Sequence, residues 1–146
     1  MLTIPSEYTT ACSNPGTVTT LPYGEKYALL YTPAKPAQHI LYLIHGGGGD
    51  QHSFFCPAFL NIVDHMMEDG TLAPLYIVSP CFYDPKETDK TPASSGIAVR
   101  RFITELREQV IPMVADDRTS FCTGKVRHQR LFHGRCDHMV CLPSCP

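Results

Sequence analysis

A histidine and four glycines, His45 to Gly49, stand together directly after an apolar run. Glycine lets backbone N–H groups face a ligand because no side chain stands in the way. In ester hydrolysis, such amides stabilise the oxyanion that forms when a nucleophile attacks the carbonyl. Losing one donor costs about 3 kcal/mol of transition-state stabilisation. One interpretation of this segment is therefore an oxyanion-hole loop.

Two other interpretations of the glycines are a flexible turn and a phosphate-binding loop. A phosphate-binding loop is disfavoured, because no Gly-Lys-Ser/Thr follows and the spacing does not complete a GxGxxG fingerprint. Glycines alone do not separate an oxyanion loop from a plain turn. His45 could act as a general base, but between a strand and a turn it is expected to pack or hydrogen-bond and hold the loop. Gly46 and Gly49 are given the same supporting role.

To be held in place, the glycine loop must be flanked by regular elements, and the sequence predicts a strand before it and a helix after it. Residues 39–44 (HILYLI) form a short, continuous apolar run, which is typical of a buried central strand in a parallel sheet. From Pro57 onward apolar residues recur every three or four positions up to Gly70, which predicts a helix of about three turns. A second apolar run at 75–78 completes the order strand, helix, strand and predicts a βαβ unit.

Further elements are expected on both sides of this unit. Residues 22–25 predict a turn into a strand at 26–32. A second crossover helix is expected to begin at Ser94 or Ser95 and to stop at Ile111-Pro112. Its apolar face would carry Val99, Phe102, Ile103, Leu106 and Val110. The fold class expected is α/β, with a mainly parallel sheet and crossover helices.

Composition excludes several classes of protein. The chain has 146 residues, 43% of them hydrophobic and 18% charged, with a formal net charge of -2, as in an ordinary globular domain. No basic cluster with interleaved aromatic residues is present, so nucleic acid is not an expected partner. No export signal is recognisable and no apolar run reaches about 18 residues, so we expect a cytoplasmic chain without a membrane partner. No cofactor is expected.

Three blocks of sequence together resemble a known family, the feruloyl-esterase-like and esterase-D-like esterases of the α/β-hydrolase superfamily. The blocks are ILYLIHGGGGD (40–50), LNIVDHMMEDGTLAPLYIVSP (60–80) and FITELREQVIPMV (102–114). The resemblance covers about residues 23 to 127 in the family's order and spacing. The family includes ester-cleaving domains that are attached to bacterial xylanases.

The resemblance implies a carboxylic-ester hydrolase with a serine in a Gly-x-Ser-x-Gly turn, followed by an acid and a histidine. It assigns the oxyanion-hole amides to Gly47 and Gly48, and a small-molecule or polysaccharide-linked feruloyl or acetyl ester as substrate. No serine of this chain lies in such a turn, so no catalytic residue is present and the chain alone is expected to be inactive. Since an α/β domain often has about 200–250 residues, residues 1–127 would be the N-terminal part of a partial fold. Whether the parent enzyme is secreted stays open.

Residues 128–146 do not continue the family pattern. Translated one nucleotide out of frame from Arg130, suitable codons give Gly-Phe-Ser-Met-Gly, which is the sequence expected around the catalytic serine. The same shifted frame continues with Ala-Val-Thr-Thr-Trp, which resembles the start of the apolar helix that follows this turn in the family. The Trp is independent of codon choice, because Met139-Val140 must give Trp in the shifted frame. The interpretation is an out-of-frame or non-native tail. A natural end of the chain is the alternative.

There are two alternative functions. The tail has the residue types of a zinc site, in His133, Cys136, His138, Cys141 and Cys145. Their spacings lack the paired C-x2-C pattern, so no metal site is assigned. A non-catalytic carbohydrate-binding relative is the second alternative, and the absence of tryptophan counts against it, since aromatic rings are needed to stack on sugars.

Overall fold

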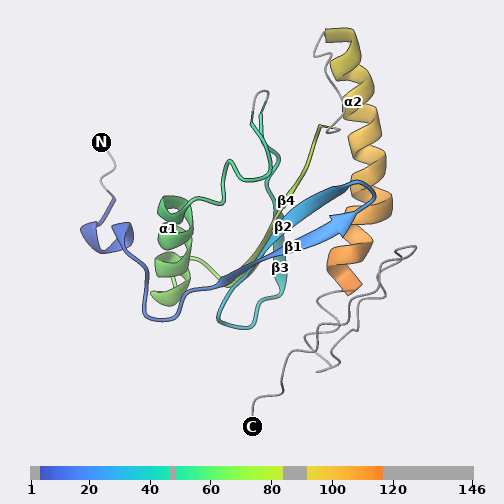
Figure 1. The fold of residues 1–146 in the computed structure, drawn as a ribbon. Coiled ribbons are helices and arrows are strands. Elements are labelled where there is room, and N and C mark those ends of the chain that lie inside the picture. The colour runs from blue at the N-terminus through green and yellow to red at the C-terminus, as the bar shows by residue number, and fades with distance from the viewer. Residues whose placement is uncertain (1–3, 47–48, 84–91, 117–146) are drawn as a thin grey trace, which may run out of the picture.

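The structure is a computed structural model that describes residues 4–46, 49–83 and 92–116, with the side chains of 92–95 left aside. A four-stranded sheet lies between two helices, α1 (Pro57–Glu68) on one face and α2 (Pro92–Glu105) on the other (Figure 1). The strands are β1 (Thr17–Tyr23), β2 (Lys26–Thr32), β3 (His39–Tyr42) and β4 (Leu75–Pro80), in the order β1-β2-β4-β3. A short 3-10 helix, η1 (Ser6–Thr9), lies beyond α1.

The sheet is mixed, so the expectation of a mainly parallel sheet was wrong for this part of the chain. β1 and β2 are antiparallel, as are β2 and β4, whereas β3 and β4 are parallel. The reason is the length of the connections, since a parallel crossover needs about a dozen residues or more. A two-residue turn with Gly24 at φ +55° joins β1 to β2, and only residues 33–38 join β2 to β3.

The βαβ unit predicted from sequence is confirmed in β3, α1 and β4. The strand at its start is shorter than expected, however, and it is not central. Within the described residues β3 has only β4 as a neighbour, and Leu41 and Ile44 are 42% and 39% exposed. An apolar run indicates that both faces of a strand can be buried. It does not indicate whether the strand has a neighbour at each of its two edges.

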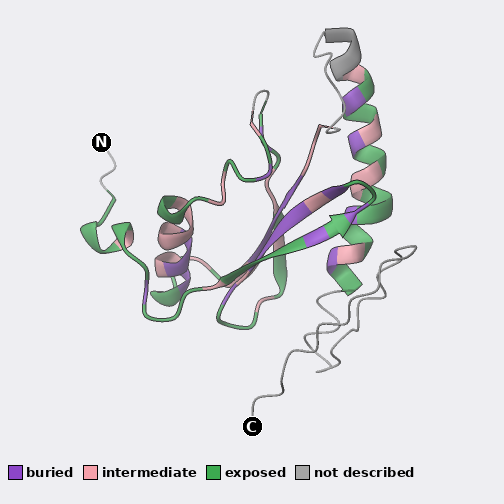
Figure 2. Ribbon diagram, in the orientation of Figure 1, coloured by how far each residue is buried: buried purple, intermediate pink, exposed green. Residues whose placement is uncertain are grey.

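The sheet buries both of its faces, and neighbouring residues of one strand point to opposite sides. On β2 and β4, Leu30 and Val78 pack on the α2 side, whereas Tyr31 and Ile77 pack on the α1 side. Figure 2 shows this as continuous buried segments along the two middle strands. The α2 side is closed by Val110, Val114 and residues of β1, and the α1 side by Val63 and Met67.

Helix α1 agrees with the prediction in place and length. Pro57 stands in its first turn, where a missing N–H costs nothing. Gly70 follows its end at φ +82°, a conformation that favours glycine. Lys35 donates from Nζ to the carbonyl oxygens of Met67 and Glu68, both at 3.1 Å, and so satisfies two of the unpaired carbonyl groups at the end of the helix.

The second helix does not stop at Ile111-Pro112, which corrects that expectation. Helical structure continues through residue 116, and a π-helical turn, η2 (Leu106–Val110), precedes the proline. The N–H of Ile111 donates to the carbonyl of Leu106, five residues earlier. Pro112 has no N–H and its ring would clash in a regular α-turn, so a wider turn just before it allows the helix to continue.

The apolar face of α2 is wider than the sheet surface that covers it. Phe102 of α2 and Val110 of the following η2 are buried as expected, but Val99 and Ile103 of α2 are 43% and 48% exposed. Along the described ranges, neither this helix nor any other combines the length and the apolarity that crossing a bilayer requires.

We expect the isolated chain to self-associate through the free edge of β3. Within the described residues this edge has no neighbouring strand, and it carries the exposed apolar side chain of Leu41. A Leu41→Lys substitution should raise the monomer fraction several-fold in light scattering at equal protein concentration. Val18→Lys is the matched control, since Val18 is 43% exposed on β1 at the opposite edge. A monodisperse unmodified chain that melts cooperatively would contradict the expectation.

Candidate functional site

The glycine loop begins at the carboxyl end of β3, beside the end of β4. The N–H of Leu43 donates to the carbonyl of Val78 at 2.9 Å, which extends the parallel pairing beyond the strand itself. Ligand sites of α/β sheets lie at the carboxyl ends of parallel strands. The loop therefore occupies the position where such a site is expected.

His45 is buried, with 6% of its surface exposed, and both of its ring nitrogens are engaged. Nε2 lies 3.3 Å from the backbone nitrogen of Phe82, which can only donate. Nε2 must therefore accept, so Nδ1 carries the proton and donates to the carbonyl of Gly46 at 3.1 Å. An imidazole held in this way joins the start of the glycine loop to the segment that follows β4.

The loop closes on itself between Gly46 and Gly49. The N–H of Gly49 donates to the carbonyl of Gly46 at 3.1 Å, so this one carbonyl accepts from both the loop and His45. The sequence assigned His45, Gly46 and Gly49 to this loop, and the structure brings all three together. Gly47 and Gly48, which were assigned the oxyanion-hole amides, lie outside the described residues.

The segment after the loop is held by a second turn. The hydroxyl of Ser53 accepts from the N–H of Asp50 at 3.0 Å, and the N–H of Ser53 donates to the carbonyl of Asp50 at 3.1 Å. A Cβ at Gly49 would stand 2.7 Å from this hydroxyl, so glycine is required there to keep the turn. His52 extends the contact to β2, because its Nε2 lies 2.9 Å from the hydroxyl of Tyr27.

Aromatic rings pack around His45. The ring of Phe82 stands edge-on to the imidazole with centroids 6.2 Å apart, and that of Tyr83 lies 5.9 Å away. Phe82 also lies 4.9 Å from Tyr83 and 4.9 Å from Phe102 of α2. His45, at the start of the glycine loop, thus packs against an aromatic cluster, formed by Phe82, Tyr83 and Phe102, that links the end of β4 to α2.

Cys81 is the thiol nearest to this cluster in the chain, and it is not activated. Burial raises the pKa of the Cys81 thiol above its usual value, although the positive charge of Lys26 acts in the opposite direction. A nucleophilic cysteine needs a lowered pKa. The thiol donates to the carbonyl of Tyr83, and the carbonyl of Cys81 accepts from Tyr23, so the residue has a structural environment.

No serine whose side chain is described is paired with a histidine. Ser6 and Ser13 bond to glutamates, and Ser53 holds the turn after the loop. Ser79 is fully buried and its hydroxyl has no hydrogen-bond partner. These residues therefore offer no activated nucleophile, in agreement with the absence of a Gly-x-Ser-x-Gly turn from the sequence.

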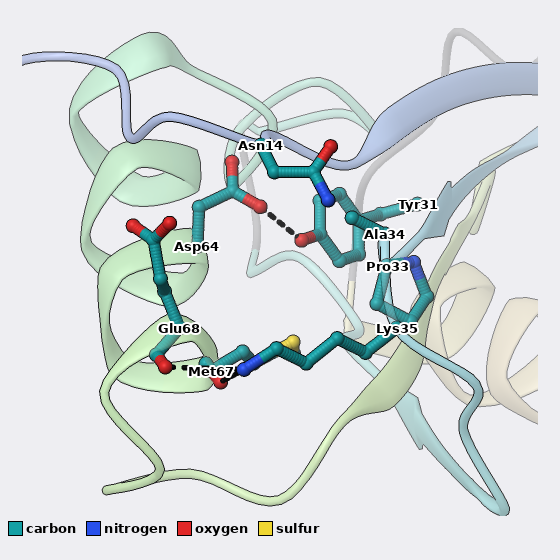
Figure 3. Close-up of a pocket in the computed structure, with 8 residues that line it drawn as sticks. All are labelled: Asn14, Tyr31, Pro33, Ala34, Lys35, Asp64, Met67 and Glu68. Carbon is teal, nitrogen blue, oxygen red and sulfur yellow. Dashed lines mark hydrogen bonds between the residues drawn. The ribbon is translucent and has the colours of Figure 1, made fainter.

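A second polar site lies at the other end of the sheet and was missed in the sequence. Asp64 of α1 is buried, and its Oδ1 accepts from the hydroxyl of Tyr31 and from the N–H of Gly16 at 2.9 Å. Figure 3 shows the Asp64–Tyr31 pair on the wall of a cavity of about 80 Å³. Burial, and then the bond to Asp64, raise the pKa of Tyr31 well above its usual value.

This pair fixes α1 to the sheet rather than taking part in the glycine loop. Tyr31 pairs with Ile77, and Ile77 lies toward the amino end of β4, whereas the loop lies at the carboxyl end. In the sequence, Asp64 lies off the apolar stripe of the predicted helix, and this position predicts a residue exposed to solvent. No local signal in the sequence shows that a tyrosine of β2 and the N–H of Gly16 meet it.

We expect Asp64→Ala to lower the free energy of unfolding by about 2 kcal/mol, because a buried hydroxyl and a buried N–H lose their acceptor. Asp64→Asn keeps an acceptor oxygen and should cost about half as much. Urea unfolding of both variants, in the Leu41→Lys background to limit association, measures the difference. Equal losses for the two substitutions would contradict this role.

The residues that the structure describes contain no candidate metal site. No group of three or more histidine, cysteine, aspartate or glutamate side chains is gathered there in a way that could hold an ion. The tail residues His133, Cys136, His138, Cys141 and Cys145 lie outside the described residues.

Comparison with known proteins identifies relatives of this fold. No family model matches the sequence. Endo-1,4-β-xylanase Y of Acetivibrio thermocellus is 34% identical over 96 residues, which are 64% of this chain and 7% of the xylanase.

Solved structures extend the similarity. A serine-to-alanine mutant of the feruloyl esterase module from Clostridium thermocellum, complexed with sinapinate, is 29% identical with a TM-score of 0.63. The match covers 78% of this chain and 40% of that one. A ferulic acid esterase from the anaerobic fungus Anaeromyces mucronatus has a TM-score of 0.62 over 77% of this chain and 48% of its own, and at 21% identity it supports the fold alone.

The chain spans less than half the length of the solved structures that it matches. Over about three quarters of its residues, the chain is similar to the feruloyl esterases, which are carboxylic-ester hydrolases of the α/β-hydrolase type.

Proposed function

We propose that this chain forms the oxyanion-loop half of a serine carboxylic-ester hydrolase. The observation that carries the proposal is the bonding of His45, which joins the glycine loop to the segment after β4 at the carboxyl end of a parallel pair. The similarity to feruloyl esterases supports the same activity. In this proposal the amides of Gly47 and Gly48 donate to the oxyanion.

The chemistry divides between two parts of the domain. A serine from the part of the domain that this chain does not span attacks the ester carbonyl. The C–O bond to the alcohol then breaks, the alcohol leaves with a proton, and the acyl group stays on the serine as an acyl-enzyme. Water hydrolyses the acyl-enzyme, which releases the carboxylic acid and restores the serine. The glycine loop stabilises the negative oxygen of both tetrahedral intermediates. His45 positions the loop and is not the base, because its Nε2 accepts from Phe82 and its Nδ1–H is donated to Gly46. The chain alone is then inactive.

An aromatic acyl group is the substrate that the surroundings of the loop favour. Phe82 and Tyr83 place two rings within 6.2 Å of the imidazole of His45, measured between centroids. Such rings can stack on a phenolic acid. Esterase structures similar to this chain are complexed with sinapinate and with ferulic acid. We therefore propose feruloyl-type esters of carbohydrate ahead of acetyl esters.

We further propose that the tail, residues 128–146, is an out-of-frame segment. Residues 128–146 would replace the segment that carries the serine, as the shifted translation from Arg130 suggests. Sequencing the source DNA through the codons for 127–146 tests this. A displaced frame that encodes Gly-Phe-Ser-Met-Gly, and later an aspartate and a histidine, supports it. A single intact frame that ends at Pro146 contradicts it.

The activity is tested with a continued chain, which we define as residues 1–127 followed by the part of the Clostridium thermocellum feruloyl esterase module that lies beyond the matched region. We expect the continued chain to hydrolyse methyl ferulate faster than a simple acetyl ester. The 146-residue chain alone should show no turnover. A continued chain that melts cooperatively but hydrolyses neither ester would contradict the proposed function.

A further inference from the structure

A tyrosine and a histidine form a solvent-accessible pair beside the glycine loop, and neither takes part in the proposed reaction steps. The hydroxyl of Tyr27 lies 2.9 Å from Nε2 of His52, and the two rings meet at 67° with centroids 5.9 Å apart. Tyr27 is half-buried and His52 is exposed. We propose that this pair binds a sugar ring in the alcohol half of the ester. The inference rests on the proposed function and names a part of its substrate.

The pair lies at the same end of the sheet as the glycine loop. Tyr27 immediately precedes the residue of β2 that pairs with Pro80, at the carboxyl end of β4. β3 also ends there, because it runs parallel to β4. His52 belongs to the turn of residues 50–53, which directly follows Gly49. A group bound to the pair is therefore one turn of the chain away from the loop that would hold the ester carbonyl.

The pair and the aromatic cluster lie on opposite sides of the sheet. Lys26 is bonded to Glu105 of α2, so its neighbour Tyr27 points to the other side, where α1 packs (Figure 1). Phe82 of the cluster lies 4.9 Å from Phe102 of α2. The two halves of an ester diverge from its carbonyl carbon, so an acyl group bound at the cluster leaves the α1 side to the alcohol.

The pair offers both kinds of contact that a sugar ring requires. A sugar has C–H groups that pack against an aromatic face and hydroxyl groups that need hydrogen-bond partners. Nε2 of His52 is held by Tyr27, whereas Nδ1 has no hydrogen-bond partner within the described residues. When the Tyr27 hydroxyl donates to Nε2, Nδ1 carries the proton and can donate to a sugar hydroxyl. Since the two rings are not stacked, one of them keeps a face free for the sugar.

The backbone and the side chain of His52 are both held in place. Its N–H donates to Oδ1 of Asp50 at 2.9 Å, and its carbonyl accepts from the N–H of Phe55 at 2.9 Å. The bond to Tyr27 then holds the imidazole against β2. A side chain fixed in this way loses little conformational freedom when a ligand binds, and this favours a binding role.

The test compares two esters of the same acid on the continued chain: feruloyl arabinose, which carries a sugar, and methyl ferulate, which does not. His52→Ala should lower the ratio of their kcat/KM values about tenfold, because a hydrogen bond and a ring contact to the sugar are lost. Tyr27→Leu should lower the ratio to a similar extent. His39→Ala is the matched control and should leave the ratio unchanged, since His39 is also exposed but stands at the start of β3, at the opposite end of the sheet.

The ratio is independent of the fraction of active enzyme, so a variant that folds poorly still gives a result. A fall of both kcat/KM values by the same factor would show that the pair only holds the turn, and would overturn the inference.

If the continued chain melts cooperatively but hydrolyses neither ester, calorimetry gives the Kd of each ester instead. A preference for feruloyl arabinose that His52→Ala removes would then retain the sugar site and reject the proposed activity. Equal Kd values for the two esters would reject both.

Discussion

Replacing Gly48 with proline in the continued chain should lower kcat for methyl ferulate by about 10²–10³-fold, with little change in KM. Proline has no N–H, and loss of one oxyanion donor weakens the transition state far more than the bound ester. The measurement is steady-state hydrolysis at saturating ester. Gly47→Pro should have a similar effect if both amides donate.

The control for this prediction is Gly46→Ala. Among the described residues, a Cβ at Gly46 meets no atom within 4 Å, so we expect the substitution to leave the loop in place and kcat to stay within about twofold. Melting curves of all variants separate lost folding from lost catalysis. A folded Gly48→Pro variant with unchanged kcat would show that the amide of this residue takes no part in the reaction.

Glu105→Ala should lower the free energy of unfolding by about 3–5 kcal/mol, because it leaves a buried ammonium group without its partner. The Nζ of Lys26 lies 2.7 Å from Oε2 of Glu105, and the two side chains are only 6% and 16% exposed. The pair joins the start of β2 to the end of α2. Arg101 lies 3.6 Å from the other oxygen of Glu105 and is 32% exposed.

The double variant Lys26→Met/Glu105→Leu shows which of two causes explains the loss of stability in Glu105→Ala. The ion pair itself could be strongly stabilising, or the loss could be the cost of leaving one buried charge unpaired. Removing both charges with apolar side chains of similar size should bring stability back to within about 1 kcal/mol of the unmodified chain. Urea unfolding of the two single variants and the double variant gives the coupling energy. Additive losses, with the double variant the least stable, would contradict this explanation.

The parts of the fold that depend on local sequence were predictable. The helix at Pro57–Glu68 follows from apolar spacing and from Gly70 at its end, and β4 follows from a short apolar run. Each of these features is determined by residues close together in the chain.

Features that depend on partners far apart in the chain were not predictable. Whether β3 is central or at an edge depends on a neighbouring strand that its own residues do not specify. Asp64 is buried because Tyr31 and Gly16, 33 and 48 residues away, meet it. The π-turn before Pro112 was missed because proline usually ends a helix, and only the packing of Val110 and Val114 shows that this helix continues.

The most direct measurement is the structure of the continued chain with a phosphonate ester bonded to its catalytic serine. The negative phosphonyl oxygen stands where the oxyanion forms. We predict that it lies 2.7–3.1 Å from the amide nitrogen of Gly47 or Gly48, the distance expected of an oxyanion-hole donor, with His45 still bonded to Phe82 and Gly46. A phosphonyl oxygen bound only by other groups, with the glycine loop turned away, would contradict the central claim that this chain supplies the oxyanion hole.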